Sequence, residues 1–401
     1  MLHNYYGSSA PSGENAVFEA ECELLRTAGH EVTEFTRNSD EVRTKGFLGA
    51  VQGGLVTPWN PWMYRAVQQV AESIHPDVVH AHNTFPLISP AIFHAIGGRA
   101  ARLITLHNCR LFCSAAILAR EDKACTKCLD RKSAWPAIQH GCYRNSRLAT
   151  VPLAASIALH RKIGTWGTQV EAFITLSNFQ RELMCTAGLP RERVWVKPNF
   201  FPGRPAVVPW LTRGKRAVFV GRLSLEKGVS NLVTAWLAWG AAAPELVVVG
   251  DGPLRETLET RVLKAGSTNI RFVGQVPAEE AQRWIASSRL LILPSRWFEG
   301  FPMVLCEAFA FGTPSIVSDT GTLPELVANS EAGAVFRAGD EGHLREVASA
   351  LWNDESGLAR MAERARQQFE SKYTEEANYQ QLMNIYDKAI ALRHANAGKK
   401  Q

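Results

Sequence analysis

Two glutamates stand at the ends of the segment EGFPMVLCE, which runs from Glu299 to Glu307. The apolar run before it predicts a buried strand, and the segment after Pro302 predicts a helix that ends at Gly312. Glu307 then lies inside this helix while Glu299 stays in the turn, so the two carboxylates have separate functions. The free N–H groups of residues 303 to 305 predict an anion site at the helix start. A carboxylate one turn further in can accept hydrogen bonds from a ribose diol, and one in the turn can contact a sugar.

Two cations, Arg222 and Lys227, follow a predicted strand and precede a helix. Ligands of open α/β sheets bind at the carboxyl ends of the strands, where two cations suit a diphosphate. The next strand ends in Gly250, Asp251 and Gly252, and glycines at this point let a ligand approach the backbone closely. A solvated turn would also explain the cations, and many strand-to-helix turns contain Gly-Asp-Gly. These features alone therefore leave both interpretations open.

Five of the eight cysteines fall between residues 109 and 142. Cys125 and Cys128 form a C-x2-C knuckle, which eleven residues separate from Cys113 and thirteen from Cys142. Four thiolates at this spacing predict a tetrahedral zinc site, and a complete shell of ligands would make that zinc structural. Ordinary buried thiols or a redox pair are the alternatives.

Short runs rich in Val, Ile and Leu alternate with helical patterns, which predicts parallel strands buried on both faces and an α/β fold wound twice. The predicted strands are 77–82, 102–108, 171–177 and 193–199 in the first half and 217–223, 245–252, 270–276, 289–295 and 314–319 in the second. A stretch rich in Pro and Gly, 200–215, separates the halves. A buried strand should also open the chain, but only Met1 and Leu2 precede a polar segment. That strand is therefore either curtailed or starts upstream.

The composition is that of a folded protein, with 401 residues of which 46% are apolar and 20% charged. This length suits two domains. The net charge of +6 fits phosphate-bearing ligands or an anionic membrane surface. No signal-peptide pattern opens the chain, and the apolar run 148–159 is shorter than the roughly 20 residues of a membrane span. We therefore expect a cytoplasmic protein.

The segments GRLSLEKG, GDGP, EGFPMVLCE and FGTPSIVSDTGTLPELV together resemble, in order and spacing, family four of the retaining glycosyltransferases, or glycosyl transferases group 1. The resemblance runs from 217 to roughly 370. It implies the α/β GT-B fold, in which two Rossmann-like lobes face a cleft between them. The implied domains are an acceptor lobe 1–203 with a cysteine-rich insert 109–142, a nucleotide-sugar lobe 204–373, and a helix 374–401 that packs back on the first lobe. A subset of the family shares such an insert.

The resemblance also implies which residues act. Arg222 and Lys227 would bind the diphosphate, Glu307 the ribose and Glu299 the transferred sugar. His107, at a strand end, matches a family histidine that contacts the donor sugar, although a lone histidine is more often structural. Glu299, His107, Arg222 and Lys227 would form the catalytic set. Further donor contacts are implied for Gly13 in the SGEN loop (where Ser12-Gly13 replaces a paired glycine), Gly250, Asp251, Gly252, Val273, Gly300, Phe301, Pro302, Met303 and Val304.

The implied activity is transfer of a hexose from a nucleotide diphosphate sugar to a glycan or lipid-linked glycan, with retention, in surface polysaccharide or glycoconjugate assembly. The sequence has no Asp-x-Asp motif, so we expect fixed cations and a helix start, and no catalytic metal, to neutralise the leaving diphosphate. Glu299 would stabilise the sugar during front-face attack. A nucleotide-sugar 2-epimerase and a non-catalytic zinc-bearing scaffold are the alternatives.

The segment 131–162 carries six cations and no acidic residue, beside Trp135, Tyr143 and the apolar run. This segment could contact anionic lipid at the inner face of a membrane, which would suit a lipid-linked acceptor. A solvated basic face over a core helix is the alternative. Nucleic-acid binding is not expected, because no recognised module is present and aromatic residues do not alternate with the charges.

Overall fold

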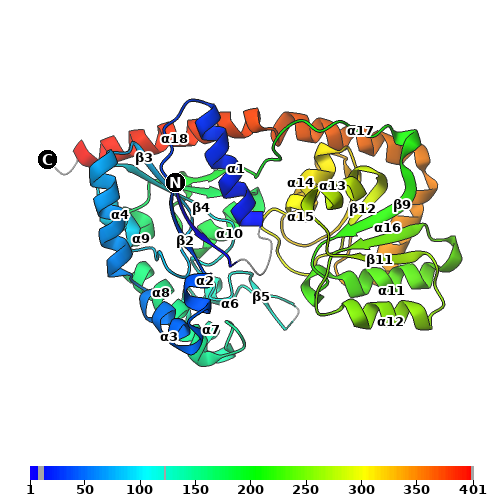
Figure 1. Ribbon diagram of the computed structural model, residues 1–401, viewed down its shortest axis with the longest axis horizontal. Helices are drawn as coiled ribbons and strands as arrows, with labels where there is room; N and C mark the ends of the chain where they lie inside the picture. The colour runs from blue at the N-terminus through cyan, green and yellow to red at the C-terminus, as the bar shows by residue number, and fades with distance from the viewer. Residues whose placement is uncertain (8–12, 122, 399–401) are drawn as a thin grey trace. The chain divides into compact units, whose positions relative to one another are not determined.

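The computed structural model of the protein describes residues 1–7, 13–121 and 123–398 (Figure 1). The chain divides into two units. The first consists of Met1–Leu118, Cys125–Pro198 and the chain from Asn378, and the second of Ala119–Ala124 and Asn199–Ala377. Within the described residues each unit is built on one six-stranded parallel sheet.

The first sheet has the strand order β2-β1-β3-β4-β7-β8. Its strands are β1 (Leu2–Tyr5), β2 (Phe35–Asn38), β3 (Val78–Asn83), β4 (Ala101–Thr105), β7 (Ala172–Thr175) and β8 (Val194–Val196). The helices of this unit are α1 (Gly13–Thr27), α2 (Asp40–Arg43), α3 (Gly46–Val56), α4 (Pro61–Ile74), α5 (Ile92–Ile96), α6 (Lys127–Asp130), α7 (Trp135–His140), α8 (Arg147–Lys162), α9 (Thr165–Thr168), α10 (Asn178–Ala187) and most of α18 (Glu375–Gly398).

The second sheet has the order β11-β10-β9-β12-β13-β14. Its strands are β9 (Gly214–Val220), β10 (Glu245–Val249), β11 (Ile270–Gly274), β12 (Ser288–Leu293), β13 (Ser315–Ser318) and β14 (Gly333–Phe336). Its helices are α11 (Val229–Trp239), α12 (Arg255–Lys264), α13 (Ala278–Ala286), α14 (Met303–Ala310), α15 (Leu323–Val327), α16 (Glu341–Asn353) and α17 (Glu355–Lys372). A short antiparallel pair, β5 (Ala119–Arg120) and β6 (Lys123–Ala124), groups with this unit.

Both faces of the second sheet are covered, because successive side chains of a strand point to opposite faces. In β9, Ala217 and Phe219 pack against α11, α12 and α16, whereas Val218 packs against α13 and α14. Figure 1 shows α11 and α12 on one side of this sheet and α13, α14 and α15 on the other. Burial on both faces explains why these strands read as continuous apolar runs.

The first sheet is also covered on both faces. On one face, Leu103 of β4 and Ile174 of β7 pack with Leu25 of α1 and with the α18 side chains Leu382 and Tyr386. On the opposite face the ring of Phe173 lies 6.3 Å from that of Trp166 in α9. The chain therefore returns from the second unit to complete the core of the first.

All nine strands predicted from apolar runs are present, and the prediction of a doubly wound α/β fold is confirmed. The N-terminal strand exists as β1, within the segment read as polar, because His3 and Asn4 are buried in it. His3 Nε2 lies 2.9 Å from Asn15 Oδ1, and Asn4 Nδ2 donates to Ser39 Oγ at 3.0 Å, so each of these buried side chains has a polar partner. The edge strands β2 and β14 were not predicted. No helix in the described part of the chain is long and apolar enough to span a membrane.

Candidate active site

The second sheet contains a point at which the strand order reverses. β9 pairs with β10 on one side and with β12 on the other, so the loops that follow β9 and β12 leave neighbouring strands toward helices on opposite faces. Ligands of open α/β sheets bind at this switch point, outside the carboxyl ends of the strands. The two loops carry the predicted residues Arg222, Lys227 and Glu299.

The backbones of these two loops touch. Gly228 adopts the left-handed conformation (φ +68°), and a Cβ at this position would lie 1.9 Å from the carbonyl oxygen of Pro294. Arg296 N donates to Glu226 O at 2.8 Å. Only glycine fits at residue 228, so the loops are held at a fixed separation.

Lys227 and Glu299 meet across the switch point. Lys227 Nζ donates to Glu299 Oε1 at 2.6 Å, and Ser295 Oγ donates to the same oxygen at 2.7 Å. Glu299 is 13% and Lys227 26% exposed, so both side chains are largely shielded from water. Within the described residues, every contact of the Glu299 carboxylate falls on Oε1. Its Oε2 is therefore available to another hydrogen-bond donor.

Arg222 is exposed, and its guanidinium has no hydrogen-bond or ion-pair partner among the described residues. It stands five positions before Lys227 in the same loop. The loop thus carries one cation that is already paired and one that is not. An anion bound here would meet both.

The start of α14 offers two donors rather than the three that the sequence predicted. Leu305 N donates to Pro302 O at 3.0 Å, so this N–H is occupied. The N–H groups of Met303 and Val304 have no partner in the described part of the chain, and they remain available to an anion.

Glu307 lies in the second turn of α14. Burial raises the pKa of its carboxyl to about 7, and a long contact of 3.5 Å from Gln282 Nε2 opposes the shift only in part. The carboxylate is thus held with few protein donors. A ligand that supplied hydroxyl donors would stabilise its charged form.

The Gly-Asp-Gly turn after β10 packs directly on the loop after β9. A Cβ on Gly250 would lie 2.0 Å from Gly221 O, and Leu223 N donates to Asp251 O at 2.9 Å. The Asp251 carboxylate accepts from Gly252 N at 2.6 Å and from Arg255 at 2.9 Å. Contacts within the fold therefore explain these residues without a ligand, and their contact with the nucleotide-sugar donor stays a prediction.

Three further residues of this unit, Phe301, Val273 and Gly300, and the neighbouring Pro302 were also predicted to contact the nucleotide-sugar donor. The ring of Phe301 points inward and lies 5.4 Å from that of Tyr373, so only its backbone is open to a ligand. Val273 is half-buried in β11 and packs with the apolar residues on the α13 face of the sheet. Gly300 is half-buried in the turn, and Pro302 is the residue immediately before α14.

In the first unit, His107 lies two residues beyond β4 and lines a pocket. Other residues that line this pocket are His82, Asn83, Phe85, Asn108 and Arg110. His107 Nε2 lies 3.0 Å from His82 Nδ1. Burial, with the neighbouring His82 and His3 adding to it, holds the pKa of His107 well below its usual value. His107 is thus a neutral imidazole at the edge of a pocket.

The predicted loop before the first helix is described only in part. Gly13 is exposed and is the first residue of α1, whereas Ser12 lies outside the described residues. Glu14, next to it, accepts from Asn108 Nδ2 at 2.9 Å. This hydrogen bond ties the start of α1 to the segment that carries His107.

Two family models match the sequence in succession. The family described as Glycosyltransferase Family 4 matches residues 12–202, and that described as Glycosyl transferases group 1 matches residues 206–368. The chain belongs to family 4 of the glycosyltransferases. Curated relatives of this family 4 glycosyltransferase include the amylovoran biosynthesis glycosyltransferase AmsK of Erwinia amylovora, 25% identical over 55% of this chain and 57% of AmsK. The putative teichuronic acid biosynthesis glycosyltransferase TuaC of Bacillus subtilis is 24% identical over 63% of this chain and 56% of TuaC. The matches span little more than half the length of these relatives.

Solved structures confirm the GT-B fold. HepE of Anabaena in complex with UDP superposes with a TM-score of 0.62 at 18% identity, over 96% of this chain and 98% of that one. The sucrose-phosphate synthase of Thermosynechococcus elongatus superposes with a TM-score of 0.66 at 17% identity, over 98% and 99%. The family 4 transferase thus has the two Rossmann-like units that its sequence predicted.

Four buried polar residues of this family 4 transferase, in the part of the first unit that carries His107, were missed in the sequence. They are Glu21 in α1, His80 and His82 in β3, and Lys197 after β8. A signal was present, because Glu21 occupies the buried stripe of α1 between Val17 and Leu25, and two histidines interrupt a buried strand two residues apart. Charged and polar groups at such positions are rare unless they are paired.

The four predicted zinc ligands come together around Cys128. Burial raises the pKa of the Cys128 thiol to about 11, and the neighbouring Cys113, Cys142 and Cys125 add to this rise. Burial also raises the pKa of Cys113, and the backbone N–H groups of Leu118, Ala115 and Ala116 oppose this rise. Within the described residues, however, the one group whose possible ligand atoms lie within 4.8 Å of one another is Glu21, His80 and His82. The four thiols are therefore neighbours that do not form a closed ligand shell.

Replacing Glu307 tests its burial. A buried carboxyl whose pKa is raised from 4.5 to about 7 destabilises the fold progressively as pH rises through this interval, because the unfolded chain ionises first. Glu307→Gln removes the ionisation, so its stability relative to wild type should improve by about 2 kcal/mol between pH 5 and pH 8. Urea unfolding of the ligand-free protein at the two pH values measures this change. The exposed Glu279→Gln serves as control, and an equal response of both variants would contradict the assignment.

Proposed function

We propose that this protein transfers a hexose, with retention of anomeric configuration, from a nucleotide diphosphate sugar to a glycan or lipid-linked glycan during surface polysaccharide or glycoconjugate assembly. The observation that carries the proposal is the Lys227–Glu299 pair at the switch point of the second sheet, beside the unpaired Arg222. The relatives support the substrate class, since HepE is complexed with UDP and AmsK and TuaC are named for polysaccharide biosynthesis.

The leaving diphosphate is the group that most needs stabilisation. Charge builds on it as the glycosyl–phosphate bond breaks, and preorganised cations and N–H groups lower the energy of that charge. Arg222, Lys227 and the free N–H groups of Met303 and Val304 supply these donors, and we assign them to the diphosphate. In this proposal fixed positive charge replaces a catalytic metal.

Glu299 would act on the sugar. Its Oε1 is occupied by Lys227 and Ser295, which orient the carboxylate, while Oε2 can accept from a sugar hydroxyl. A carboxylate oriented in this way can also stabilise positive charge on the sugar as the bond breaks. Since Lys227 already neutralises it in part, Glu299 suits stabilisation better than nucleophilic attack, which agrees with front-face attack by the acceptor.

Glu307 would bind the ribose. Its carboxylate has one weak hydrogen-bond donor from the protein, so two ribose hydroxyls would supply the hydrogen bonds that the protein does not provide. Binding would then favour the ionised form. The free protein is less stable with Glu307 than it need be, which is common where a residue serves a ligand.

Lys227→Ala tests the assignment. The variant should lose transfer by at least a hundredfold in kcat while retaining its fold, because it removes a cation from the leaving group. The assay uses a panel of nucleotide-sugars with no added divalent cation, and circular dichroism checks the fold. Lys264→Ala, at the exposed end of α12, is the matched control and should retain full activity.

Near-normal turnover by Lys227→Ala would remove the diphosphate assignment. Incubation of wild type with the donor alone separates the alternatives. Formation of an epimer would indicate a 2-epimerase, whereas donor binding with neither hydrolysis nor transfer would indicate a scaffold. Slow hydrolysis of one nucleotide-sugar, accelerated transfer to an acceptor and an unchanged anomeric configuration are expected.

We also propose that Cys113, Cys125, Cys128 and Cys142 hold a structural zinc ion. Little apolar packing stabilises the segment that carries them. Its helices α6 and α7 are short, and the local apolar cluster consists of Ala134, Ala154, Ile157 and Ile138. Small elements with little core are commonly held by a metal. Zinc would draw the four neighbouring thiols into a tetrahedral shell.

Nearby charges favour thiolates in this segment. Arg110 opposes the rise in the pKa of Cys113, and Arg161 lies close enough to Cys128 to interact with its thiolate. A zinc ion with four thiolates has a net charge of −2, and two guanidinium groups would compensate it.

Metal analysis of gently purified protein tests the zinc proposal. About one zinc per chain is expected for wild type, and Cys128→Ser should lose most of it and lower the thermal midpoint. Cys185→Ser, in α10 outside the group, should keep the metal. Wild-type protein with far less than one zinc per chain would refute the site.

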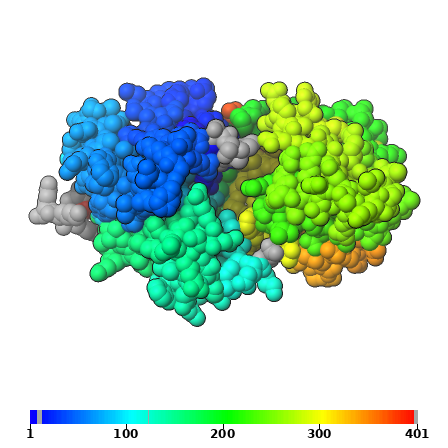
Figure 2. Space-filling view, turned by 60° about the horizontal axis from the view of Figure 1, so that its bottom comes forward, coloured from blue at the N-terminus to red at the C-terminus, as the bar shows by residue number. Residues whose placement is uncertain are grey.

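A further proposal concerns contact with an anionic lipid surface. Phe47, Leu48 and Leu55 of α3 and Leu148 of α8 are each at least 76% exposed. α3 packs on α8, where the ring of Pro152 lies 3.3 Å from the position of a Cβ on Gly54. Figure 1 and Figure 2 both show the segments of α3 and of α7 and α8 side by side in the first unit. We therefore include α3 with the segment 131–162 in the proposed lipid-contacting surface.

Cations flank this apolar surface. Arg131, Lys132, Arg144, Arg147 and Lys162 are exposed. Arg161 is different, because its guanidinium lies over the ring of Phe112 and donates to Ala187 O. Apolar side chains surrounded by lysine and arginine suit an interface with anionic headgroups. A lipid-linked acceptor would be presented at such a surface.

Vesicle co-sedimentation tests the lipid proposal. Wild type should bind vesicles that contain anionic lipid and not neutral ones, and the double variant Phe47→Asp, Leu48→Asp should weaken binding at least tenfold. Leu263→Asp, which changes an equally exposed leucine of the second unit, is the control. Equal binding by wild type and the double variant would contradict the proposal.

A further inference from the structure

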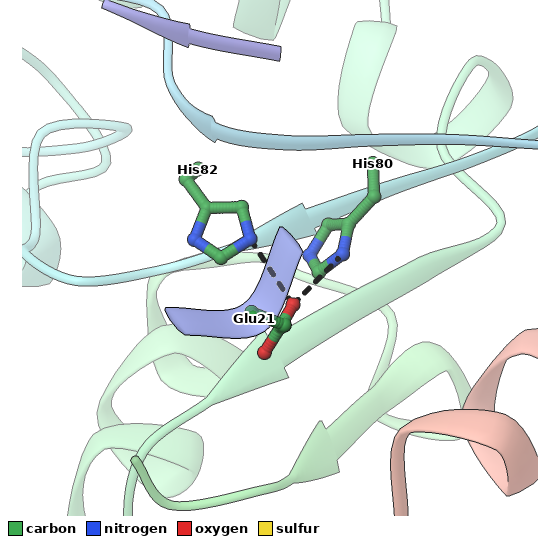
Figure 3. A group of neighbouring side chains, drawn as sticks. All are labelled: Glu21, His80 and His82. Carbon is green, nitrogen blue, oxygen red and sulfur yellow. Dashed lines mark hydrogen bonds and ion pairs between the residues drawn. The ribbon is translucent and has the colours of Figure 1, made fainter. Parts of the chain in front are cut away.

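A buried polar network in the first unit includes Glu21, His80 and His82 (Figure 3). At its centre is Glu21 of α1, which is fully buried. Its Oε1 lies 3.1 Å from His82 Nε2 and 3.4 Å from His80 Nδ1, and its Oε2 accepts from Lys197 Nζ at 2.7 Å. His82 in turn contacts His107 at 3.0 Å, so one chain of contacts links Glu21 to the edge of the pocket.

This network does not suit a metal ion, although two histidines and a carboxylate are metal-ligand types. Both nitrogens of His80 are engaged, one by Thr105 Oγ1 at 2.8 Å and the other by Tyr386 OH at 2.9 Å. Both nitrogens of His82 are engaged as well. The Lys197 ammonium is already paired with Glu21 Oε2, and its positive charge would repel a metal cation bound beside it.

The charges of the network balance when its histidine rings are neutral. Burial alone would raise the pKa of Glu21, but Lys197 and His82 hold it well below its usual range, so Glu21 is an anion. Lys197 is its counter-ion. Burial holds the pKa values of His80 and His107 well below their usual value, so each of these rings carries one proton.

One proton per ring fixes the direction of each hydrogen bond. The carboxylate of Glu21 can only accept, so His82 must donate from Nε2. Because Lys197 and Glu21 compensate each other inside the fold, a further buried charge on His82 would have no counter-ion. His82 Nδ1 then presents a lone pair, and His107 must donate to it from Nε2. The proton of His107 is thereby placed on Nε2, which leaves Nδ1 as a lone pair with no partner among the described residues.

We infer that Glu21 and His82 are positioning residues that hold His107 in the Nε2–H tautomer, so that its Nδ1 accepts a hydrogen bond from a hydroxyl of the sugar substrate. The inference rests on the proposed function, because it names how one side chain of that site meets a sugar. His107 would then select substrates that present a hydroxyl donor at this position. An analogue in which that hydroxyl is replaced by fluorine would lose the contact.

Nitrogen-15 NMR of histidine-labelled protein tests the inference without any sugar. The couplings of the ring nitrogens distinguish the two tautomers, and His107→Asn assigns the signal of His107. Wild type should show His107 as the Nε2–H form. In Glu21→Gln, Lys197 holds the amide oxygen and turns the amide NH2 toward His82, so both rings should reverse and His107 should become Nδ1–H.

His82→Gln is a second variant that leaves the buried ion pair intact. It removes the ring nitrogen that contacts His107, so His107 should populate both tautomers. His80→Gln is the matched control, because His80 is equally buried and also contacts Glu21 but leads away from His107. Its His107 signal should remain Nε2–H.

The activity of the same variants gives an independent readout. Glu21→Gln should lower kcat/KM for transfer by tenfold or more, and His80→Gln by less than threefold. His107 found as Nδ1–H in wild type, or unchanged in both Glu21→Gln and His82→Gln, would overturn the inference. Failure of every nucleotide-sugar to react would instead overturn the proposed function, while the NMR result would still stand or fall by itself.

Discussion

The hydrogen-bonded ion pair between Lys227 and Glu299 depends on one general constraint. In a parallel sheet, the loops that follow the strands all lie at the same edge. These residues are far apart in sequence, yet β9 and β12 are neighbours and their loops leave at the point where the strand order reverses. Gly228 lets the loop backbones touch and sets their separation. The chemistry of the second unit follows from this arrangement, because a paired cation, an unpaired cation and a helix start share one edge.

A second lysine–glutamate pair serves a different end. Lys197 and Glu21 are almost completely buried, and their distance of 2.7 Å is close to the 2.6 Å of the pair in the second unit. The two pairs differ in their access to solvent, and this difference sets what each pair can do. The partly open pair can exchange its partners for a ligand, whereas the closed pair is cut off from water and can act only through the rings attached to it. Removing one member of a buried pair leaves an uncompensated charge, so this pair is also a strong structural constraint.

The sequence predicted the fold where burial is simple and failed where buried groups are polar. Nine strands were found because they consist of apolar runs, most of which are buried on both faces. β1 was misread because the buried side chains of His3 and Asn4 have partners in Asn15 and Ser39, and such partners are not visible in a linear pattern. The types of residue at the switch point were predicted, but the direct bond between Lys227 and Glu299 depends on strand order. Glu21 and the two strand histidines were missed for the same reason as β1, since their partners come from different elements.

The position of α18 has a consequence for how the chain is made. Leu382 and Tyr386 complete a core whose other members, such as Leu25 and Leu103, are synthesised hundreds of residues earlier. The nascent first unit therefore leaves the ribosome with one face of its sheet only partly covered, and it stays so while the entire second unit is translated. A polypeptide released before α18 is made would lack part of the apolar core of its first unit. The first unit can therefore complete its core only after the second unit has been made.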